Sequence, residues 1–131
     1  MRATIITSLF KASSFLEEFL ENVVAQTVFR QCELYLMDGN SPENEYEIAE
    51  PFLKKYSNIK YKKLNKDPGI YGCWNLMIKD SDSEYITNCN VDDKMYSTCI
   101  EEHMALLDKE KDIDVAYCYN AVQEELPICL S

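Results

Sequence analysis

Short β-branched runs alternate with amphipathic segments along almost the whole chain. The runs predict five strands, and the apolar side chains between them recur at helical spacing. The order βαβαβαβαβ favours a mostly parallel sheet flanked by helices, in the α/β class. The length of 131 residues fits a single domain spanning 1–131. The predicted strands cover residues 4–9, 32–37, 59–64, 84–89 and 113–118.

Several helix boundaries carry their own signals. The S-x-x-E pattern at residues 14–17 predicts a capping box on the first helix. The second helix is expected to begin at Ser41-Pro42, and Pro51 predicts that it is kinked or split in two. Asp67-Pro68 is expected to open the third helix, with Asp67 as its N-cap.

Composition excludes some classes of protein. The net charge of −10 disfavours binding to nucleic acid, and an anionic ligand would need a local cation. The six cysteines form no C-x-x-C pair, and a single histidine cannot complete a usual zinc site, so we expect reduced thiols. No apolar run approaches the roughly 20 residues of a membrane span, and no signal peptide is evident, which predicts a cytoplasmic protein.

The turns at the carboxyl ends of the strands are the expected ligand edge. Asp92 and Asp93 follow the fourth strand, and adjacent carboxylates there could hold Mg²⁺ or Mn²⁺. The alternative is a solvated turn with two ordinary acidic residues. Asp38 could accept a hydrogen bond from a base or ribose, or it could form an Asx-turn or cap the following helix. Phe10 could pack on a nucleobase, or simply on the protein.

Five segments in order carry a family resemblance, which extends from residue 4 to about residue 118. Residues 5–11 resemble I-I-T-P-x-Y-N, and residues 15–27 resemble a first helix that closes in Q-T. Residues 36–41 match a D-G-x-S turn, residues 67–75 a segment containing G-I-Y, and residues 90–93 an N-x-D-D form of the D-x-D motif. Together they resemble family 2 glycosyltransferases of the GT-A fold.

The resemblance implies a nucleotide-sugar donor site and a divalent cation, Mn²⁺ or Mg²⁺. The implied reaction moves a sugar from a nucleotide-diphosphate sugar to an acceptor hydroxyl with inversion, as in polysaccharide biosynthesis. The acceptor would be a saccharide or a lipid-linked molecule, which is compatible with peripheral membrane association. The implied metal ligands are Asp92 and Asp93, and the implied donor contacts are Thr7, Ser8, Phe10, Asp38, Asp67, Asn75 and Asp92.

The sequence also departs from the family. Ser8, Phe10, Lys11 and Gly72 replace the usual Pro, Tyr, Asn and acidic residue. Family members normally continue well beyond this length, through an acceptor region and an acidic catalytic base. We therefore expect the GT-A domain to be truncated and its base to lie beyond residue 131. The alternative is a non-catalytic remnant that binds nucleotide sugars, and exposed apolar surface would favour a homo-oligomer in either case.

Overall fold

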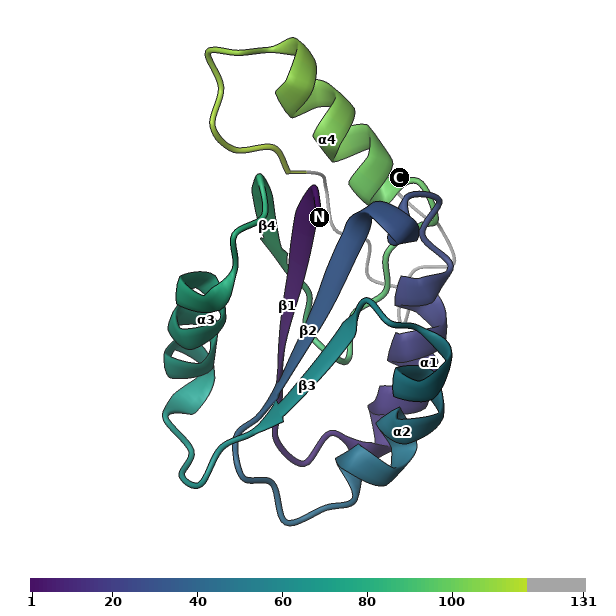
Figure 1. Ribbon diagram of the computed structural model, residues 1–131, viewed down its shortest axis with the longest axis vertical. Coiled ribbons are helices and arrows are strands. Elements are labelled where there is room, and N and C mark those ends of the chain that lie inside the picture. The colour runs from purple at the N-terminus through teal and green to yellow at the C-terminus, as the bar shows by residue number, and fades with distance from the viewer. Residues whose placement is uncertain (118–131) are drawn as a thin grey trace, which may run out of the picture.

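A four-stranded parallel sheet forms the centre of the computed structural model, which describes residues 1–117 (Figure 1). Its strands are β1 (Ala3–Leu9), β2 (Cys32–Asp38), β3 (Ile59–Lys63) and β4 (Tyr85–Asn88), in the order β3-β2-β1-β4. Every neighbouring pair is parallel. The predicted α/β class with a mostly parallel sheet is confirmed.

Helices cover both faces of this sheet. In Figure 1, α1 (Ser13–Val24) and α2 (Glu45–Lys55) lie on one side, and α3 (Gly69–Asp80) lies on the other. A short 3₁₀ helix, η1 (Phe29–Gln31), precedes β2, and α4 (Cys99–Lys109) follows β4. The second helix is a single element that contains Pro51, and it begins at residue 45 rather than residue 41.

The β-branched run of the first strand is buried on both faces. Ile5 belongs to the larger hydrophobic core, which also contains Leu16 and Phe19 of α1. Ile6 belongs to a second core cluster with Met77 of α3. Strands covered on both faces read as continuous apolar runs rather than alternating ones, which explains the sequence of β1.

The N-terminus of α1 is capped from another segment of the chain. Glu45 Oε2 accepts a hydrogen bond from the Ala12 N–H at 3.0 Å, and Glu43 Oε1 accepts one from the Ser13 N–H at 3.2 Å. Carboxylates stabilise this end of a helix because it carries a partial positive charge. The capping box predicted at 14–17 is wrong, since α1 begins at Ser13 and these two glutamates supply the acceptors.

Residues 113–117 form no strand, so the prediction of a fifth strand is wrong over these residues. Val115 is 75% exposed and Tyr117 is 86% exposed, and in the part of the chain that is described neither packs on the sheet. Cys118, the last residue of that prediction, lies outside the described residues.

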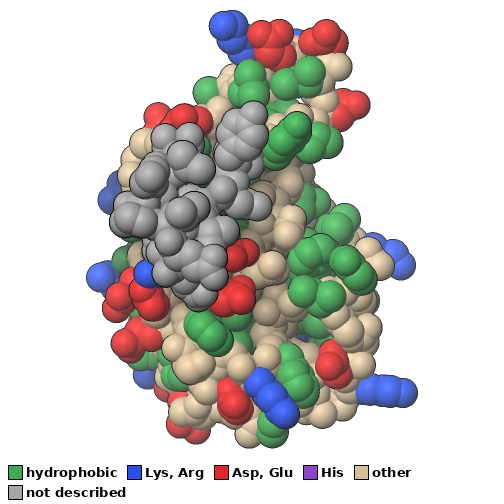
Figure 2. Space-filling model, turned by 180° about the vertical axis from the view of Figure 1, so that it is seen from behind, with side chains coloured by type: hydrophobic (Ala, Val, Ile, Leu, Met, Phe, Trp, Pro, Cys, Tyr) green, Lys and Arg blue, Asp and Glu red, His purple; other side chains and the backbone are tan. Residues whose placement is uncertain are grey.

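Among residues 1–117, no helix is both long and apolar enough to cross a bilayer. The outer surface of α3 nevertheless carries exposed apolar side chains, namely Ile70, Tyr71, Leu76 and Ile78. In Figure 2, seen from behind, hydrophobic side chains gather on the side of the molecule where α3 lies. Self-association through apolar surface stays a prediction.

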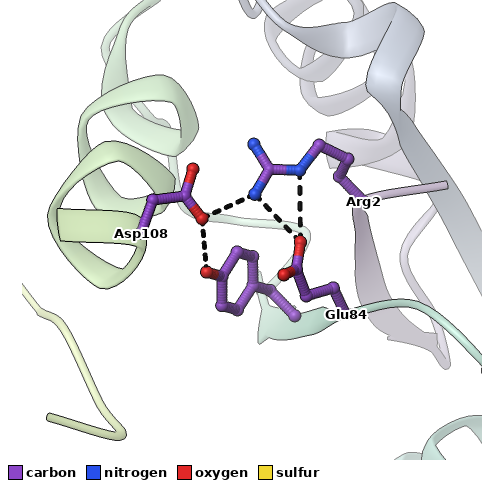
Figure 3. Close-up of polar contacts among 4 residues, drawn as sticks. Arg2, Glu84 and Asp108 are labelled. Carbon is purple, nitrogen blue, oxygen red and sulfur yellow. Dashed lines mark hydrogen bonds and ion pairs between the residues drawn. The ribbon is translucent and has the colours of Figure 1, made fainter. Parts of the chain in front are cut away.

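A polar cluster joins α4 to the amino ends of two strands (Figure 3). The Arg2 guanidinium donates to Glu84 at 2.9 Å and to Asp108 at 2.6 Å, and the Tyr85 hydroxyl also donates to Asp108 at 2.6 Å. These bonds, the one from Arg2 foremost, hold the pKa of the Asp108 carboxyl below its usual value. The cluster therefore fastens the far end of α4 to the sheet.

We expect Asp108→Asn to lower the melting temperature at neutral pH and to matter less in acid. Because the folded pKa of Asp108 is lowered, its ionised form stabilises the fold above the unfolded pKa of about 3.9, and that contribution disappears as the pH falls through the folded value. Thermal melts from pH 7 down to about pH 3 measure this. Asp112→Asn, at an exposed turn, is the control. A pH-independent difference would contradict the assignment.

Candidate functional site

A cleft of about 440 Å³ opens at the carboxyl edge of the sheet. It lies beyond the ends of β1 and β4, where the strand order reverses direction along the chain. Open α/β sheets bind ligands at such a switch point, because the two adjoining loops diverge there and leave a crevice. The cleft is lined by residues 8–11, Phe15, Gly39, Asp67, Gly69, Ile70, Cys73 and residues 90–92.

A backbone hydrogen bond outside the regular strand pairing fixes one wall of the cleft. The Gly39 N–H donates to the Leu9 carbonyl at 2.9 Å, which ties the end of β2 to the end of β1. A Cβ at Gly39 would lie 3.0 Å from Asp67 Oδ1, closer than side chains normally pack. Glycine at this position therefore lets the loop before α3 approach the central strands.

Four of the predicted donor contacts line the cleft: Ser8, Phe10, Asp67 and Asp92. Phe10 is about half exposed, so its ring is available to a ligand. Asp67 accepts a hydrogen bond from the Gly69 N–H at 2.8 Å, beside the start of α3. Pro68, rather than Asp67, occupies the N-cap position of that helix.

The other predicted residues lie outside the cleft lining. Thr7 is buried, and its hydroxyl donates to the Cys89 carbonyl at 2.8 Å, which fixes the start of the loop that carries Asp92. Asn75 is exposed on α3 and is not part of the lining. Asp93 is exposed next to the cleft, and its N–H donates to the Asn90 carbonyl at 3.0 Å.

Asp38 is buried, with 2% of its surface exposed, and both of its carboxylate oxygens are bonded inside the protein. Oδ1 accepts from the Ser41 N–H at 2.8 Å, and Oδ2 accepts from the Tyr61 hydroxyl at 2.6 Å. Burial and this bond to Asp38 raise the pKa of Tyr61 well above its ordinary value, so Tyr61 stays a donor. Asp38 thus fixes its own turn through the backbone three residues on, and it supports the loop at Gly39.

The Asp92–Asp93 pair fits part of a site for a hard divalent cation. Both carboxylates are exposed at a turn, and carboxylate oxygens suit Mg²⁺ and Mn²⁺. Within residues 1–117, no group of three or more His, Cys, Asp or Glu side chains could hold a metal alone. Burial raises the pKa of the Cys89 thiol to about 12, and a thiol suits softer metals than Mg²⁺ or Mn²⁺. The remaining ligands would have to come from water or from a bound anion.

Lys11 also lines the cleft, and sequence reasoning did not select it. It is the one lysine or arginine among the described lining residues, and its Nζ lies 5.8 Å from the centre of the Phe10 ring. Its backbone has a φ of 51°, in the left-handed region, and its N–H donates to Ser41 Oγ at 2.9 Å. Asparagine tolerates this conformation better than lysine does. The presence of Lys11 where the family usually has Asn was therefore the sequence signal that could have drawn attention to this residue.

We expect Lys11→Asn to raise the free energy of unfolding by about 0.5–1 kcal/mol, because it relieves a left-handed conformation that most side chains resist. Chemical denaturation measures this. Lys66→Asn removes an exposed lysine without a positive φ and controls for the lost charge. Equal effects of the two substitutions would contradict the strain at residue 11.

We expect Tyr61→Phe to cost about 1–3 kcal/mol of stability, because the buried Oδ2 of Asp38 loses its donor. Tyr56→Phe is the matched control, since the half-buried Tyr56 ring packs edge-on against Phe29 and its hydroxyl makes no hydrogen bond among residues 1–117. Urea unfolding of both variants gives the comparison. Similar small losses would show that Asp38 does not depend on Tyr61.

Comparison with known proteins agrees with this architecture. The model of "Glycosyl transferase family 2" matches residues 4–128. Glycosyltransferase GlyG of Streptococcus pneumoniae is 24% identical over 118 residues, which cover 89% of this chain and 39% of GlyG. The chain thus spans about two-fifths of the length of that relative.

Two solved structures share the fold. S. aureus TarS 1–349 in complex with UDP-GlcNAc superposes with a TM-score of 0.75 at 20% identity, over 83% of this chain and 32% of that one. The mannosyltransferase PcManGT from Pyrobaculum calidifontis, in complex with GDP-Man and Mn²⁺, gives a TM-score of 0.65 at 17% identity, over 70% and 27% of the two chains. The family match covers most of the present sequence, and the fold is the GT-A fold. The chain belongs to glycosyl transferase family 2.

Proposed function

We propose that the cleft binds a nucleotide-diphosphate sugar and that the chain supplies the donor-binding part of a metal-dependent, inverting glycosyltransferase. The observation that carries this proposal is the convergence of three loops. Asp92 from the end of β4 lines one cleft with Phe10 from the end of β1 and Gly39 from the end of β2. The cleft therefore brings together an aromatic ring, a backbone segment without a side chain at Gly39, and a carboxylate.

Each part of the donor has a chemically suitable neighbour. The exposed ring of Phe10 can stack on a nucleobase. The carboxylates of Asp92 and Asp93 can hold Mn²⁺ or Mg²⁺ against a diphosphate, and such a cation stabilises the charge that develops on the departing phosphate. Ser8 and Asp67 line the same cleft and can bond to hydroxyl groups of the donor. Thr7 and Asp38 act through the loops that they fix.

Charge explains why a cation is needed. The protein carries a net charge of −10, and Asp67 and Asp92 both line the cleft. A diphosphate would be repelled from such a site unless positive charge lay close to it. Lys11 supplies one such charge at the cleft, and a divalent cation on Asp92 and Asp93 would supply the larger one.

Similar proteins support the class of donor. TarS and PcManGT are described with UDP-GlcNAc and with GDP-Man and Mn²⁺, so uridine and guanosine diphosphate sugars are the first donors to test. The acceptor is a hydroxyl of a saccharide or of a lipid-linked molecule. Attack by this hydroxyl on the anomeric carbon breaks the bond to the diphosphate, and the acidic base that removes its proton is expected outside this chain.

Thermal-shift titrations with UDP-, GDP- and dTDP-sugars, with and without Mn²⁺, test the proposal. We expect one donor to raise the melting temperature in a metal-dependent way, since ligand at 100 times its Kd stabilises by about 2.7 kcal/mol. Asp92→Asn and Asp93→Asn should remove the metal-dependent part. Asp82→Asn, at an exposed position in the segment before β4, is the matched control and should not.

Donor hydrolysis measured on the same samples separates an enzyme from a binding module. Turnover that is lost in Asp93→Asn supports catalysis, whereas metal-dependent binding without turnover supports the non-catalytic alternative. The absence of a melting shift with all three donors in the presence of Mn²⁺ would sink the donor-site proposal.

A further inference from the structure

Three polar side chains on α1 and just beyond its end, here called the stripe, contact the segment that follows Asp93. Glu18 and Asn22 lie four residues apart on one face of α1, and Gln26 follows two residues after the helix ends at Val24. All three bind within residues 94–100, which join the Asp92–Asp93 turn to α4. The stripe therefore runs alongside the segment that follows the acidic turn.

The two amides of the stripe each make a pair of bonds to backbone groups. Asn22 Nδ2 donates to the Met95 carbonyl at 2.9 Å, and Asn22 Oδ1 accepts from the Met95 N–H at 2.9 Å. Gln26 Nε2 donates to the Tyr96 carbonyl at 2.8 Å, and Gln26 Oε1 accepts from the Ile100 N–H at 3.1 Å. Each side-chain amide thus binds the loop through both its oxygen and its nitrogen.

Burial separates the strong contacts of the stripe from the weak one. Gln26 is only 4% exposed, and Ile100 beside it is equally buried, so a lost bond would leave a buried backbone N–H without a partner. The Thr98 N-cap makes no capping bond with its own side chain, so Gln26 acts as the cap of α4. The ion pair between Glu18 and Lys94 is more than half exposed and contributes little.

These contacts restrict where the carboxylates can be. The loop leaves the sheet at Cys89, where the Thr7 hydroxyl binds the Cys89 carbonyl. It is next fixed at Met95 by Asn22, and between the two the Asp93 N–H closes a turn onto Asn90. A short segment tied at both ends has few conformations, so the stripe governs the direction of Asp92 and Asp93.

We propose that Asn22 and Gln26 are positioning residues for the carboxylate pair, and that they set the affinity of the site for a divalent cation on a nucleoside diphosphate. This inference rests on the proposed donor site. Thr27 supports the same contact, since its N–H donates to the Ser97 carbonyl at 2.9 Å and its hydroxyl to Glu101 at 2.6 Å. The Gln26-Thr27 pair thus has a physical role in docking α4.

The test compares Asn22→Leu and Gln26→Leu with Asn58→Leu. Asn58 is also half-buried and also makes two bonds to backbone, donating to the carbonyls of Phe29 at 2.9 Å and Cys32 at 2.8 Å, and neither bond reaches residues 94–100. Because Asn58 lines one hollow with Gln26, Asn22→Leu is the decisive comparison. All three variants should lose stability. Only the first two should bind Mn²⁺ with UDP or GDP more weakly, by up to about the 10–100-fold that the loss of a direct partner of a metal ligand causes.

Calorimetric titration of Mn²⁺ into each variant with UDP or GDP measures the affinity, and amide hydrogen exchange of Asp93, Met95 and Ile100 reports on the loop. Exchange should accelerate in Asn22→Leu and Gln26→Leu, not in Asn58→Leu. If Gln26→Leu does not fold, the half-buried Asn22 carries the comparison. A loss of affinity no larger than that of Asn58→Leu would overturn the inference.

Failure of the two proposals can be told apart. If the wild-type chain binds neither nucleotide with Mn²⁺, the donor site fails, and hydrogen exchange alone decides whether Asn22 and Gln26 hold the turn. If the wild type binds and exchange at Asp93 is unchanged in both leucine variants, the donor site stands and the positioning role is refuted.

Discussion

Every wall of the cleft is fixed relative to the strand β1, which is hydrogen-bonded on both sides and buried on both faces. Residues 3–6 pair with both β2 and β4, residues 7–9 pair with β2, and Ile5 and Ile6 contact the cores on opposite sides of the sheet. A strand held in this way has little freedom to shift its register, because a slip of one residue would exchange the two faces. Loops that leave its carboxyl end therefore start from fixed points.

The second layer of control comes from side chains that never reach the cleft. Asp38 and Thr7 are buried, and their side chains form hydrogen bonds with neighbouring backbone groups and, for Asp38, with Tyr61. Asn22 and Gln26 do the same for the segment after Asp93. Because buried polar groups must be paired, each of these residues specifies a loop conformation rather than a contact with a ligand.

Residue patterns predicted much of this fold, because parallel strands and amphipathic helices have distinct periods. They also placed Ser8, Phe10, Asp67 and Asp92 at one edge, since carboxyl ends of parallel strands meet there. They did not predict contacts between distant segments. Asp38 pairs with Tyr61, and α1 is capped by Glu43 and Glu45. No local sequence pattern predicts either pairing. The strand expected over 113–118 was inferred from its local run of β-branched and apolar residues, which does not say whether a partner edge is within reach.

The capping of α1 has a consequence for anyone who exchanges loops between members of this family. Glu45 is fully buried and is the first residue of α2, and its carboxylate accepts a hydrogen bond from the Ala12 N–H before α1. The first and second strand-to-helix connections are therefore one unit. A transplanted first loop would arrive without the acidic partner that its amide groups require, so chimeras that keep 10–13 together with 41–45 from a single parent should be the ones that fold.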